Sequence, residues 1–308
     1  MIEHPTFLVL GAGTSAEYGF PTGRGLIREI YDRLTNETKE WFPLLEDCGF
    51  EVPLIIDFGD RLWQADPPSV DDFLAIPNNN AKFKDIGKAI IALFLILHET
   101  KEAITRTNDE SEETKLYTFL YYRMGTDAGS FKASASRLSI FTFNYDRSLE
   151  YYLHQTLTNQ LGDEKQALDC LNYLHIYHVY GILCPPHYRD GSNGRPFTPA
   201  HDKQIIERCM KSMYMIGETN PDFAGIDRSY QLTAEVHNLC FLGFGYSPEN
   251  ILRLRFLKSF LDRVSIFGTA YHKSPNEVLE IQNLVHAPID LGDPNQKSVE
   301  YLQSRLVL

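Results

Sequence analysis

Short apolar runs and amphipathic stretches follow one another at the start of the chain. Residues Thr6–Leu10 (TFLVL) form an apolar run that Gly11 closes, which is typical of a buried parallel strand. Residues 23–34 then place four apolar side chains at spacings of three and four, the period of an amphipathic helix: Leu26, Ile27, Ile30 and Leu34. The order of strand, glycine turn and helix predicts the opening unit of a parallel α/β sheet.

The same alternation returns in the second half of the chain. Helical patterns cover residues 145–154 and 248–261, and residues 184–200 are a loop rich in proline and glycine. Strand patterns recur at residues 138–143, 174–180, 238–243 and 263–267. Strands that alternate with helices predict an α/β fold with a Rossmann-like parallel sheet, whose ligand groups gather at the strand ends.

No strand pattern follows the first helix promptly. Ser69 is a suitable N-cap for a short helix through Leu74, and residues 85–107 and 112–122 indicate two further helices. The strongest apolar run, residues 89–97, has nine residues, whereas a membrane span needs roughly 20, so we expect a buried helix and no membrane segment. We therefore expect one domain over residues 1–308, with a helical insertion at about 36–132.

Composition narrows the class of protein. Of 308 residues, 43% are hydrophobic and 23% charged, which is ordinary for a globular protein. The formal net charge of −12 repels phosphate backbones, so we expect no direct binding to nucleic acid, and an anionic ligand needs local geometry to hold it. The opening residues MIEHPTFLVLG lack a signal-peptide pattern, which favours a cytoplasmic protein.

The five cysteines are far apart along the chain, and none belongs to a CxxC pair. A four-cysteine zinc ribbon therefore cannot be assembled, and we expect reduced thiols and no zinc.

The first turn, Gly11-Ala12-Gly13-Thr14-Ser15-Ala16, fits the GxGxxG/A dinucleotide pattern in its alanine variant. Glycines let the backbone approach a pyrophosphate, and amide N–H groups at a helix start neutralise it. A tight turn without a ligand is the alternative. A nicotinamide-dependent dehydrogenase would carry an acid on a second strand about 20 residues later, but Asp32 falls inside a helix.

A longer string and three later motifs carry a family resemblance. Residues 11–22 (GAGTSAEYGFPT) resemble the GAGxSxxxGxP motif of the sirtuin superfamily. Residues 144–146 (NYD), 178–181 (HVYG) and 243–247 (GFGYS) follow in that family's order, each at the end of an expected strand. They resemble its Asn-x-Asp motif, its catalytic histidine before glycine and its late glycine-serine loop. A sirtuin-type Rossmann sheet is the fold that this implies.

Two departures separate the chain from protein-deacetylating sirtuins. It lacks their zinc module of two CxxC pairs, and Thr22-Gly23-Arg24 stands where deacetylases usually have Asp-Phe-Arg. Residues 69–74 (SVDDFL) instead resemble a segment common in bacterial sirtuin-like NADases of antiphage defence. The resemblance therefore implies a hydrolase that cleaves its substrate NAD+ to ADP-ribose and nicotinamide.

The resemblance and the residue types together predict a site. Asn144 would hold the attacking water or a ribose hydroxyl, His178 would be the general base, and Asp146 would orient Asn144 or the nicotinamide amide. Arg24 would pair with a phosphate. The residues expected to bind the dinucleotide are Gly11, Ala12, Gly13, Thr14, Ser15, Pro21, Thr22, Arg24, Gly243, Gly245 and Ser247. No metal ligands are expected.

Other interpretations stay open at this point. Asn144 and Asp146 could cap the following helix, His178 could be a core histidine, and Arg24 could lie on a solvated helix face. The same site could also serve an NAD-dependent deacylase or ADP-ribosyltransferase, or a non-catalytic sensor of NAD+ or ADP-ribose. Because an enzyme that drains NAD+ must be silent until triggered, the resemblance further suggests a homo-oligomer or a HerA-type DNA-translocating ATPase partner.

Overall fold

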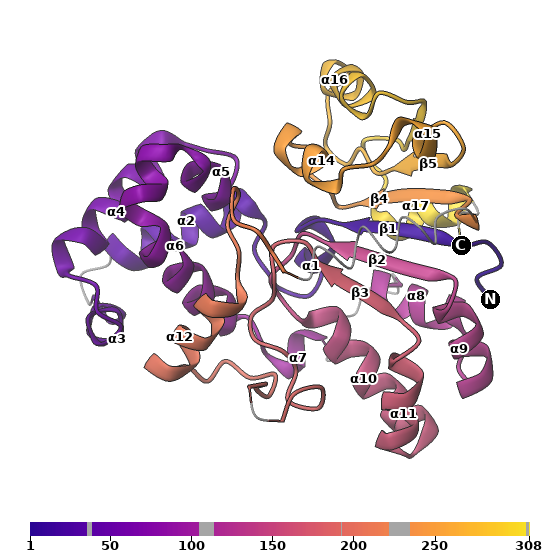
Figure 1. Cartoon of the computed structure of the whole chain (residues 1–308), viewed down its shortest axis with the longest axis horizontal. Coiled ribbons are helices and arrows are strands. Elements are labelled where there is room, and N and C mark those ends of the chain that lie inside the picture. The colour runs from indigo at the N-terminus through magenta and orange to yellow at the C-terminus, as the bar shows by residue number, and fades with distance from the viewer. Residues whose placement is uncertain (36–38, 105–113, 192, 222–234, 306–307) are drawn as a thin grey trace.

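The computed structural model describes residues 1–308 except 36–38, 105–113, 192, 222–234 and 306–307. Within the described residues, six parallel strands form one sheet in the order β3-β2-β1-β4-β5-β6 (Figure 1). The strands are β1 (Thr6–Leu10), β2 (Leu138–Thr142), β3 (His175–His178), β4 (Asn238–Leu242), β5 (Ser265–Gly268) and β6 (Ile289–Leu291). The order 3-2-1-4-5-6 is that of the Rossmann fold, and the predicted α/β class is confirmed.

Helices connect and cover the strands. Pro77 and Pro248 each begin a helix, where the missing N–H of proline costs no hydrogen bond. The helices are α1 (Gly13–Ala16), α2 (Gly23–Thr35), α3 (Phe42–Asp47), α4 (Val52–Ala65), α5 (Val70–Ala75), α6 (Pro77–Leu97), α7 (Lys101–Ile104), α8 (Leu116–Met124), α9 (Ala128–Ala135), α10 (Ser148–Leu161), α11 (Glu164–Leu171), α12 (Lys203–Ser212), α14 (Pro248–Leu254), α15 (Lys258–Leu261), α16 (Pro275–Val285) and α17 (Ser298–Arg305).

The described residues between β1 and β2 form helices and connections, with no strand among them. Ser69 caps α5 by accepting a hydrogen bond from the backbone N–H of Asp72, as its sequence position predicts. The helix expected over 85–107 has different bounds, because α6 begins at Pro77 and ends at Leu97. Residues 105–107 lie outside the described part of the chain, as do 112 and 113 at the start of the next expected helix.

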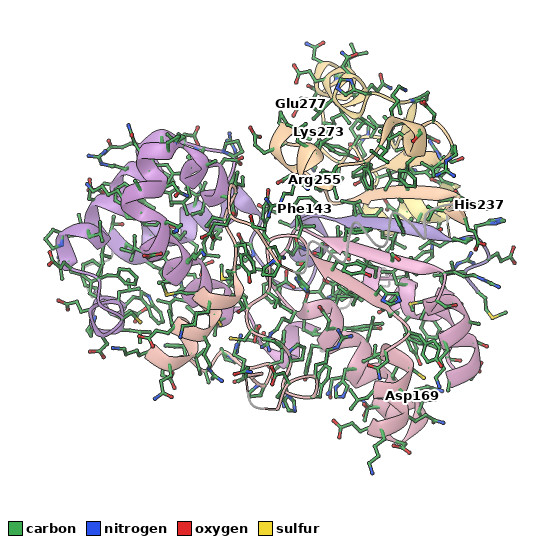
Figure 2. The ribbon with its side chains drawn as sticks, viewed as in Figure 1. Phe143, Asp169, His237, Arg255, Lys273 and Glu277 are labelled. Carbon is green, nitrogen blue, oxygen red and sulfur yellow. The ribbon has the colours of Figure 1, made fainter. Side chains whose placement is uncertain are left out.

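The C-terminal part differs from the expectation in two ways: one predicted helix is divided, and three elements were not predicted. The single helix expected over 248–261 is two, α14 and α15, because Arg255 adopts the left-handed conformation (φ 49°) and ends α14. The sixth strand, β6, and the helices α16 and α17 were not expected. The helix α16 opens with a reciprocal capping box between Ser274 and Glu277, and Lys273 pairs with Glu277 at 3.0 Å (Figure 2).

The central strand β1 is buried along its whole length, because each face of the sheet is covered there. Alternate side chains of β1 enter two different clusters: Leu8 and Leu10 join the larger core, and Phe7 and Val9 join the smaller one. The smaller core lies under α14–α16, and the larger one continues into the helices α2–α6. Figure 1 shows these helices, together with α12, as a lobe beyond the carboxyl ends of β1 and β2.

The register of the sheet determines which residues meet at that end. Leu10 pairs with Thr142 of β2 on one side and with Leu242 of β4 on the other. The residues that follow, including Gly11 and Phe143, therefore leave the sheet and line one cavity. Figure 2 shows Phe143 at this edge, where the lobe faces the sheet. This is the point at which strand order reverses, the usual ligand position of open α/β sheets. Across the described ranges, no helix has the combination of length and apolar character that membrane crossing would need.

Candidate active site

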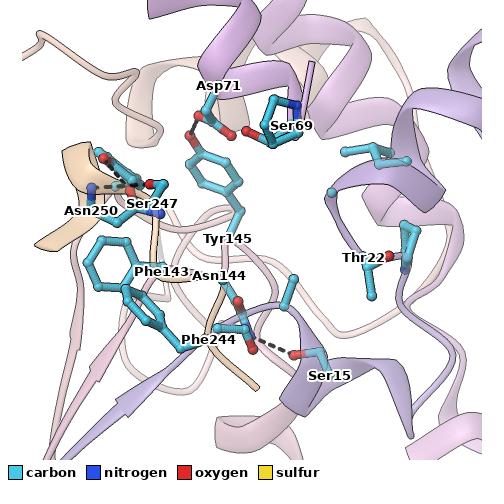
Figure 3. Close-up of a pocket in the computed structure, with 18 of the residues that line it drawn as sticks. Ser15, Thr22, Ser69, Asp71, Phe143, Asn144, Tyr145, Phe244, Ser247 and Asn250 are labelled. Atoms are coloured by element: carbon cyan, nitrogen blue, oxygen red, sulfur yellow. Dashed lines mark hydrogen bonds between the residues drawn. The ribbon is translucent and has the colours of Figure 1, made fainter. Parts of the chain in front are cut away.

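A cavity of about 240 Å³ lies between the strand ends and the lobe (Figure 3). Its sheet side comes from the segments after β1, β2, β3 and β4, and its lobe side includes residues 20–26 and 68–72. The volume is slightly below the roughly 300–1,000 Å³ of typical ligand pockets, so the cavity has room for part of a dinucleotide but not for all of one. Of the predicted residues, those that line it are Gly11, Ala12, Ser15, Pro21, Thr22, Asn144, Asp146, Gly245 and Ser247.

The glycines of the first turn are needed for backbone packing. A Cβ atom on Gly11 would lie 2.5 Å from the carbonyl oxygen of Gly243, and one on Gly13 would lie 2.9 Å from Gly243 Cα. Gly243 itself has φ +54° and touches the same turn. These glycines let the loops after β1 and β4 meet closely, whether or not a ligand binds. Gly13 and Gly243 do not line the cavity.

Gly245 is different from those glycines. A Cβ atom there would meet nothing within 4 Å, and the residue lines the cavity. Neither packing nor a positive φ explains this glycine, so it leaves room on the cavity wall for a bound group.

Asn144 is held in place by its amide group. Its Nδ2 donates to the Gly11 carbonyl at 3.1 Å and to Ser15 Oγ at 2.9 Å, which uses both amide hydrogens (Figure 3). Its Oδ1 accepts no hydrogen bond from the described residues. This assignment of oxygen and nitrogen follows from the bonding partners. The side chain therefore presents a free acceptor at the cavity, rather than capping α10.

Asp146 is buried at the cavity floor and accepts from Ser148, through both its backbone N–H and its hydroxyl. Burial raises the pKa of Asp146, although the bonds from Ser148 oppose that shift. Ser148 also bonds the Tyr117 hydroxyl at 2.7 Å, and Tyr117 lies 3.4 Å from Ser15. A chain of hydroxyls thus links Asp146 to Asn144. The capping alternative holds in part for Asp146, which serves the first N–H of α10.

His178 does not line the cavity. It forms the last residue pair between β3 and β2, with Thr142, and so lies inside the sheet, directly before the residues that follow the strand ends. Its Nδ1 donates to the Asn144 carbonyl at 2.8 Å, and its Nε2 lies 2.6 Å from Glu150 Oε1. Because both partners are acceptors, both ring nitrogens carry hydrogen and the ring is an imidazolium.

The electrostatics agree with this charge state. Burial lowers the pKa of His178, but the Glu150 carboxylate and the carbonyl of Asn144 raise it by more, so the net shift is upward. Burial likewise raises the pKa of Glu150, and His178 lowers it by more. A buried imidazolium has no free nitrogen to accept a proton. The geometry therefore favours a positioning role, in which His178 holds the segment that carries Asn144, over the general-base role expected from the sequence.

The lobe contributes a carboxylate from residues 69–74, a segment that carries part of the family resemblance but in which no site residue was predicted. Asp71, in the first turn of α5, lines the cavity, and its Oδ1 accepts from the Tyr145 hydroxyl at 2.6 Å (Figure 3). Burial raises the pKa of Asp71 to about 6, with a smaller contribution from the neighbouring charge of Asp72. A carboxylate of this kind accepts protons near neutral pH. No periodicity or spacing in the sequence indicates that Asp71 faces Tyr145.

Tyr180 is the second residue that the sequence did not single out. It leaves the sheet two residues after His178, lines the cavity and donates to Asn250 Oδ1 at 2.8 Å. Its position directly before Gly181, at a strand end, was the available signal. Ser247 caps α14 by accepting from the Asn250 N–H, so its hydroxyl has a structural use as well as a place on the cavity wall.

Two further predicted residues lie away from the cavity. Arg24 is exposed on α2, in agreement with the solvated-face alternative, and Thr14 is buried with its hydroxyl on the Gly11 carbonyl at 2.7 Å. The charged side chains that line the cavity are all acidic. Three carboxyl groups line it, those of Asp71, Asp72 and Asp146, and no Lys, Arg or His is among the described lining residues.

The described residues contain no cluster of three or more His, Cys, Asp or Glu side chains arranged to hold a metal ion. What the arrangement offers is an amide acceptor, a proton-accepting carboxylate and an acidic wall at the reversal point of a dinucleotide-type sheet. No protein-family model matches the chain, and no curated protein matches its sequence.

Proposed function

We propose that this chain is an NAD+ glycohydrolase that cleaves the bond between nicotinamide and ribose, releasing ADP-ribose and nicotinamide. One observation carries the proposal: the free Oδ1 of Asn144 and the carboxylate of Asp71 face one acid-lined cavity at the reversal point of the sheet. The pyridinium ring of NAD+ is a cation, and the sugar becomes positive as the bond breaks. An acidic wall favours both charges.

Each residue has a role in this reaction. Asn144 Oδ1 accepts a hydrogen bond from a ribose hydroxyl or from the attacking water. As the carbon–nitrogen bond breaks, its electron pair leaves with neutral nicotinamide. Water then adds to the anomeric carbon of ribose, and Asp71 accepts the proton that this water loses. Asp146 and His178 act through Asn144, which they position from below the cavity.

The pyrophosphate needs neutral donors, because the cavity wall offers it no cationic side chain among the described residues. Thr22 and Ser247, which carry hydroxyl groups, line the cavity, and Gly245 on the same wall leaves open space around its Cα. This arrangement suits a chain of net charge −12, in which bulk electrostatics cannot attract an anion.

Product analysis tests the proposal. Purified wild-type protein, incubated with NAD+, is expected to yield nicotinamide and ADP-ribose in equal amounts by liquid chromatography and mass spectrometry. Asn144→Ala should reduce this turnover on the order of 100-fold or more, whereas Asn172→Ala, an exposed control at the C-cap of α11, should not. O-acyl-ADP-ribose or an ADP-ribosylated protein would identify a transferase instead. Calorimetric NAD+ binding without nicotinamide release would identify a sensor. If the protein neither binds NAD+ nor releases nicotinamide, the proposal is refuted.

Regulation is part of the same proposal. An enzyme that depletes NAD+, as in antiphage defence, requires a silent state, which an oligomer or a HerA-type ATPase partner would provide. The mass of the protein in solution, measured together with its turnover, tests this. A monomer with full activity on its own contradicts it.

A further inference from the structure

Two cysteines far apart in the sequence meet behind the active site. Cys184 follows β3 and Cys209 lies in α12, and their sulfur atoms are 3.2 Å apart. Both side chains are buried, with exposed fractions of 1% and 0%. Both are free thiols, as are the other three cysteines. The two sulfurs already share a hydrogen bond and need no large movement to form a covalent bond.

A buried group of charges lies beside the two thiols. Glu99 accepts from Arg147 at 2.6 and 3.0 Å, and Arg195 Nη2 lies 2.6 Å from the same carboxylate. All three side chains are buried, and two guanidinium groups face one carboxylate, so one positive charge is in excess. The Nε of Arg195 bonds no acceptor among the described residues. A buried positive charge of this kind stabilises a neighbouring thiolate.

The thiols therefore have different proton affinities. The hydrogen bond from Cys209, assisted by Arg195 and opposed by burial, lowers the pKa of Cys184 to about 7. The same bond, together with burial, raises the pKa of Cys209. The two shifts favour Cys184 as the sulfur that ionises and Cys209 as the thiol that donates to it, the arrangement of a nucleophile with its resolving partner.

We propose that Cys184 and Cys209 are a redox-active pair, which a small peroxide converts to an intrachain disulfide. The Cys184 thiolate attacks one oxygen of hydrogen peroxide and becomes a sulfenic acid, and the leaving hydroxide takes up a proton to become water. Cys209 then attacks the Cys184 sulfur, forms the disulfide and expels the second oxygen, which leaves as water with the thiol proton. Two thiols and one hydrogen peroxide thus give one disulfide and two water molecules.

Access limits the oxidant to a small molecule. A cavity of about 20 Å³, with room for one water-sized molecule, borders both Arg147 and Arg195, while the two sulfurs are buried and do not line it. Hydrogen peroxide is close to that size, whereas glutathione disulfide is far larger. We expect peroxide to form the bond in the folded protein and glutathione disulfide to do so much more slowly.

The disulfide would join two walls of the active-site region. Residues 180–184 run beside the end of α12, where Ile182 N–H donates to the Ser212 carbonyl at 3.0 Å and Tyr214 N–H donates to the Tyr180 carbonyl at 2.8 Å. Leu183 N–H in turn donates to the Tyr145 carbonyl at 2.9 Å. Since α12 packs against α6 of the lobe, the bond would tie the lobe to the sheet directly behind Tyr145 and Tyr180.

Peptide mapping tests the pair on the folded wild-type chain. The protein is treated with hydrogen peroxide and then denatured in the presence of N-ethylmaleimide, which blocks the remaining thiols. It is then digested and analysed by mass spectrometry. We expect a peptide that links Cys184 to Cys209, lost on treatment with dithiothreitol, to form on the order of tenfold faster than oxidation of Cys170 or Cys240. No such peptide at peroxide doses that oxidise those two cysteines, or linkage to another cysteine, would overturn the proposal.

Two variants separate the roles of the sulfurs. In Cys209→Ser, Cys184 should stop at the sulfenic acid and be labelled by dimedone that is present while the treated protein is denatured, whereas Cys184→Ser should give no label at Cys209. Cys240→Ser, which removes a buried cysteine in β4, is the matched control and should still form the bond. Equal labelling of Cys184 and Cys209 would contradict the assigned order. None of these readouts depends on NAD+ turnover.

Discussion

The hydroxyl of Tyr145 donates to Asp71 Oδ1 at 2.6 Å and so joins the segment after β2 to the first turn of α5. The same hydroxyl lies 3.2 Å from the Tyr214 carbonyl, so Tyr145 contacts the lobe at two points. The bond also affects chemistry, because it opposes the rise in the pKa of Asp71 that burial causes.

Asp71→Asn is expected to lower the rate of nicotinamide release by roughly 100- to 10,000-fold, the usual contribution of a general base. In the wild type the rate should rise with pH through about 6, where Asp71 loses its proton, and this acid limb should vanish in the variant. Initial rates between pH 5 and 8 provide the measurement. Asp47→Asn, at an exposed position in α3, is the control. An unchanged acid limb would remove Asp71 from the mechanism.

Tyr145→Phe should move that limb without abolishing it. The Tyr145 hydroxyl lowers the pKa of Asp71, so its loss should raise the pKa and shift the limb to higher pH. Turnover should fall at pH 6 and be little changed at pH 8, and the lost hydrogen bond should cost about 1 kcal/mol of unfolding free energy. A rate that falls equally at both pH values would argue against coupling between the two residues.

Two glycine substitutions should separate packing from ligand binding. Gly11→Ala places a Cβ atom 2.5 Å from the Gly243 carbonyl, and the required backbone shift should cost about 1–3 kcal/mol or more. Gly245→Ala meets no atom within 4 Å, so its thermal stability should stay within about 0.5 kcal/mol while NAD+ binding weakens. Thermal unfolding and calorimetry measure the two effects. Unchanged NAD+ affinity in Gly245→Ala would exclude that wall from the binding site.

The pair of His178 and Glu150 should make stability depend on pH in both directions. The folded-state pKa of His178 lies above 6.5, so its contribution is fully present below pH 6.5 and is lost as pH rises through the raised value. The pKa of Glu150 lies below 4.5, so its contribution is lost as pH falls through that lower value.

Glu150→Gln should therefore be less stable than the wild type at pH 6, by on the order of 3 kcal/mol, with the difference shrinking at higher pH. Melting temperatures from pH 5 to 9 test this, and Asp262→Asn, which removes an exposed pair with Lys258, is the control. A difference that grows with pH would contradict a charged His178.

Much of the fold was predictable because it rests on local patterns. Five apolar runs predict five of the strands to within a few residues. They begin at residue 6 and near residues 138, 174, 238 and 263. The short β6 has only three residues, which are too few to show the alternation of apolar and polar residues that identifies a strand. The bounds of α6 and the break at Arg255 also escaped prediction, since they depend on packing and on one backbone conformation.

The candidate site was predictable only as far as strand ends mark it. Asn144 directly follows a strand pattern, and it faces the cavity as expected. His178 and Tyr180 lie two residues apart in the strand pattern expected over 174–180, but β3 ends at His178, which pairs with Thr142, and Tyr180 lies beyond it. Sequence alternation places both on the same face and cannot say where the sheet ends.

By itself, the sequence determined five of the six strands, most of the helical segments and the acidic character of the chain. These follow from neighbouring residues, whose periodicity and conformational preferences act over a few positions. Tertiary structure decided that Asp71 meets Tyr145 and that Cys184 meets Cys209. Such contacts join positions 74 and 25 residues apart, and they arise only when the lobe packs against the sheet, because side chains at that separation are brought together by the shared burial of many others.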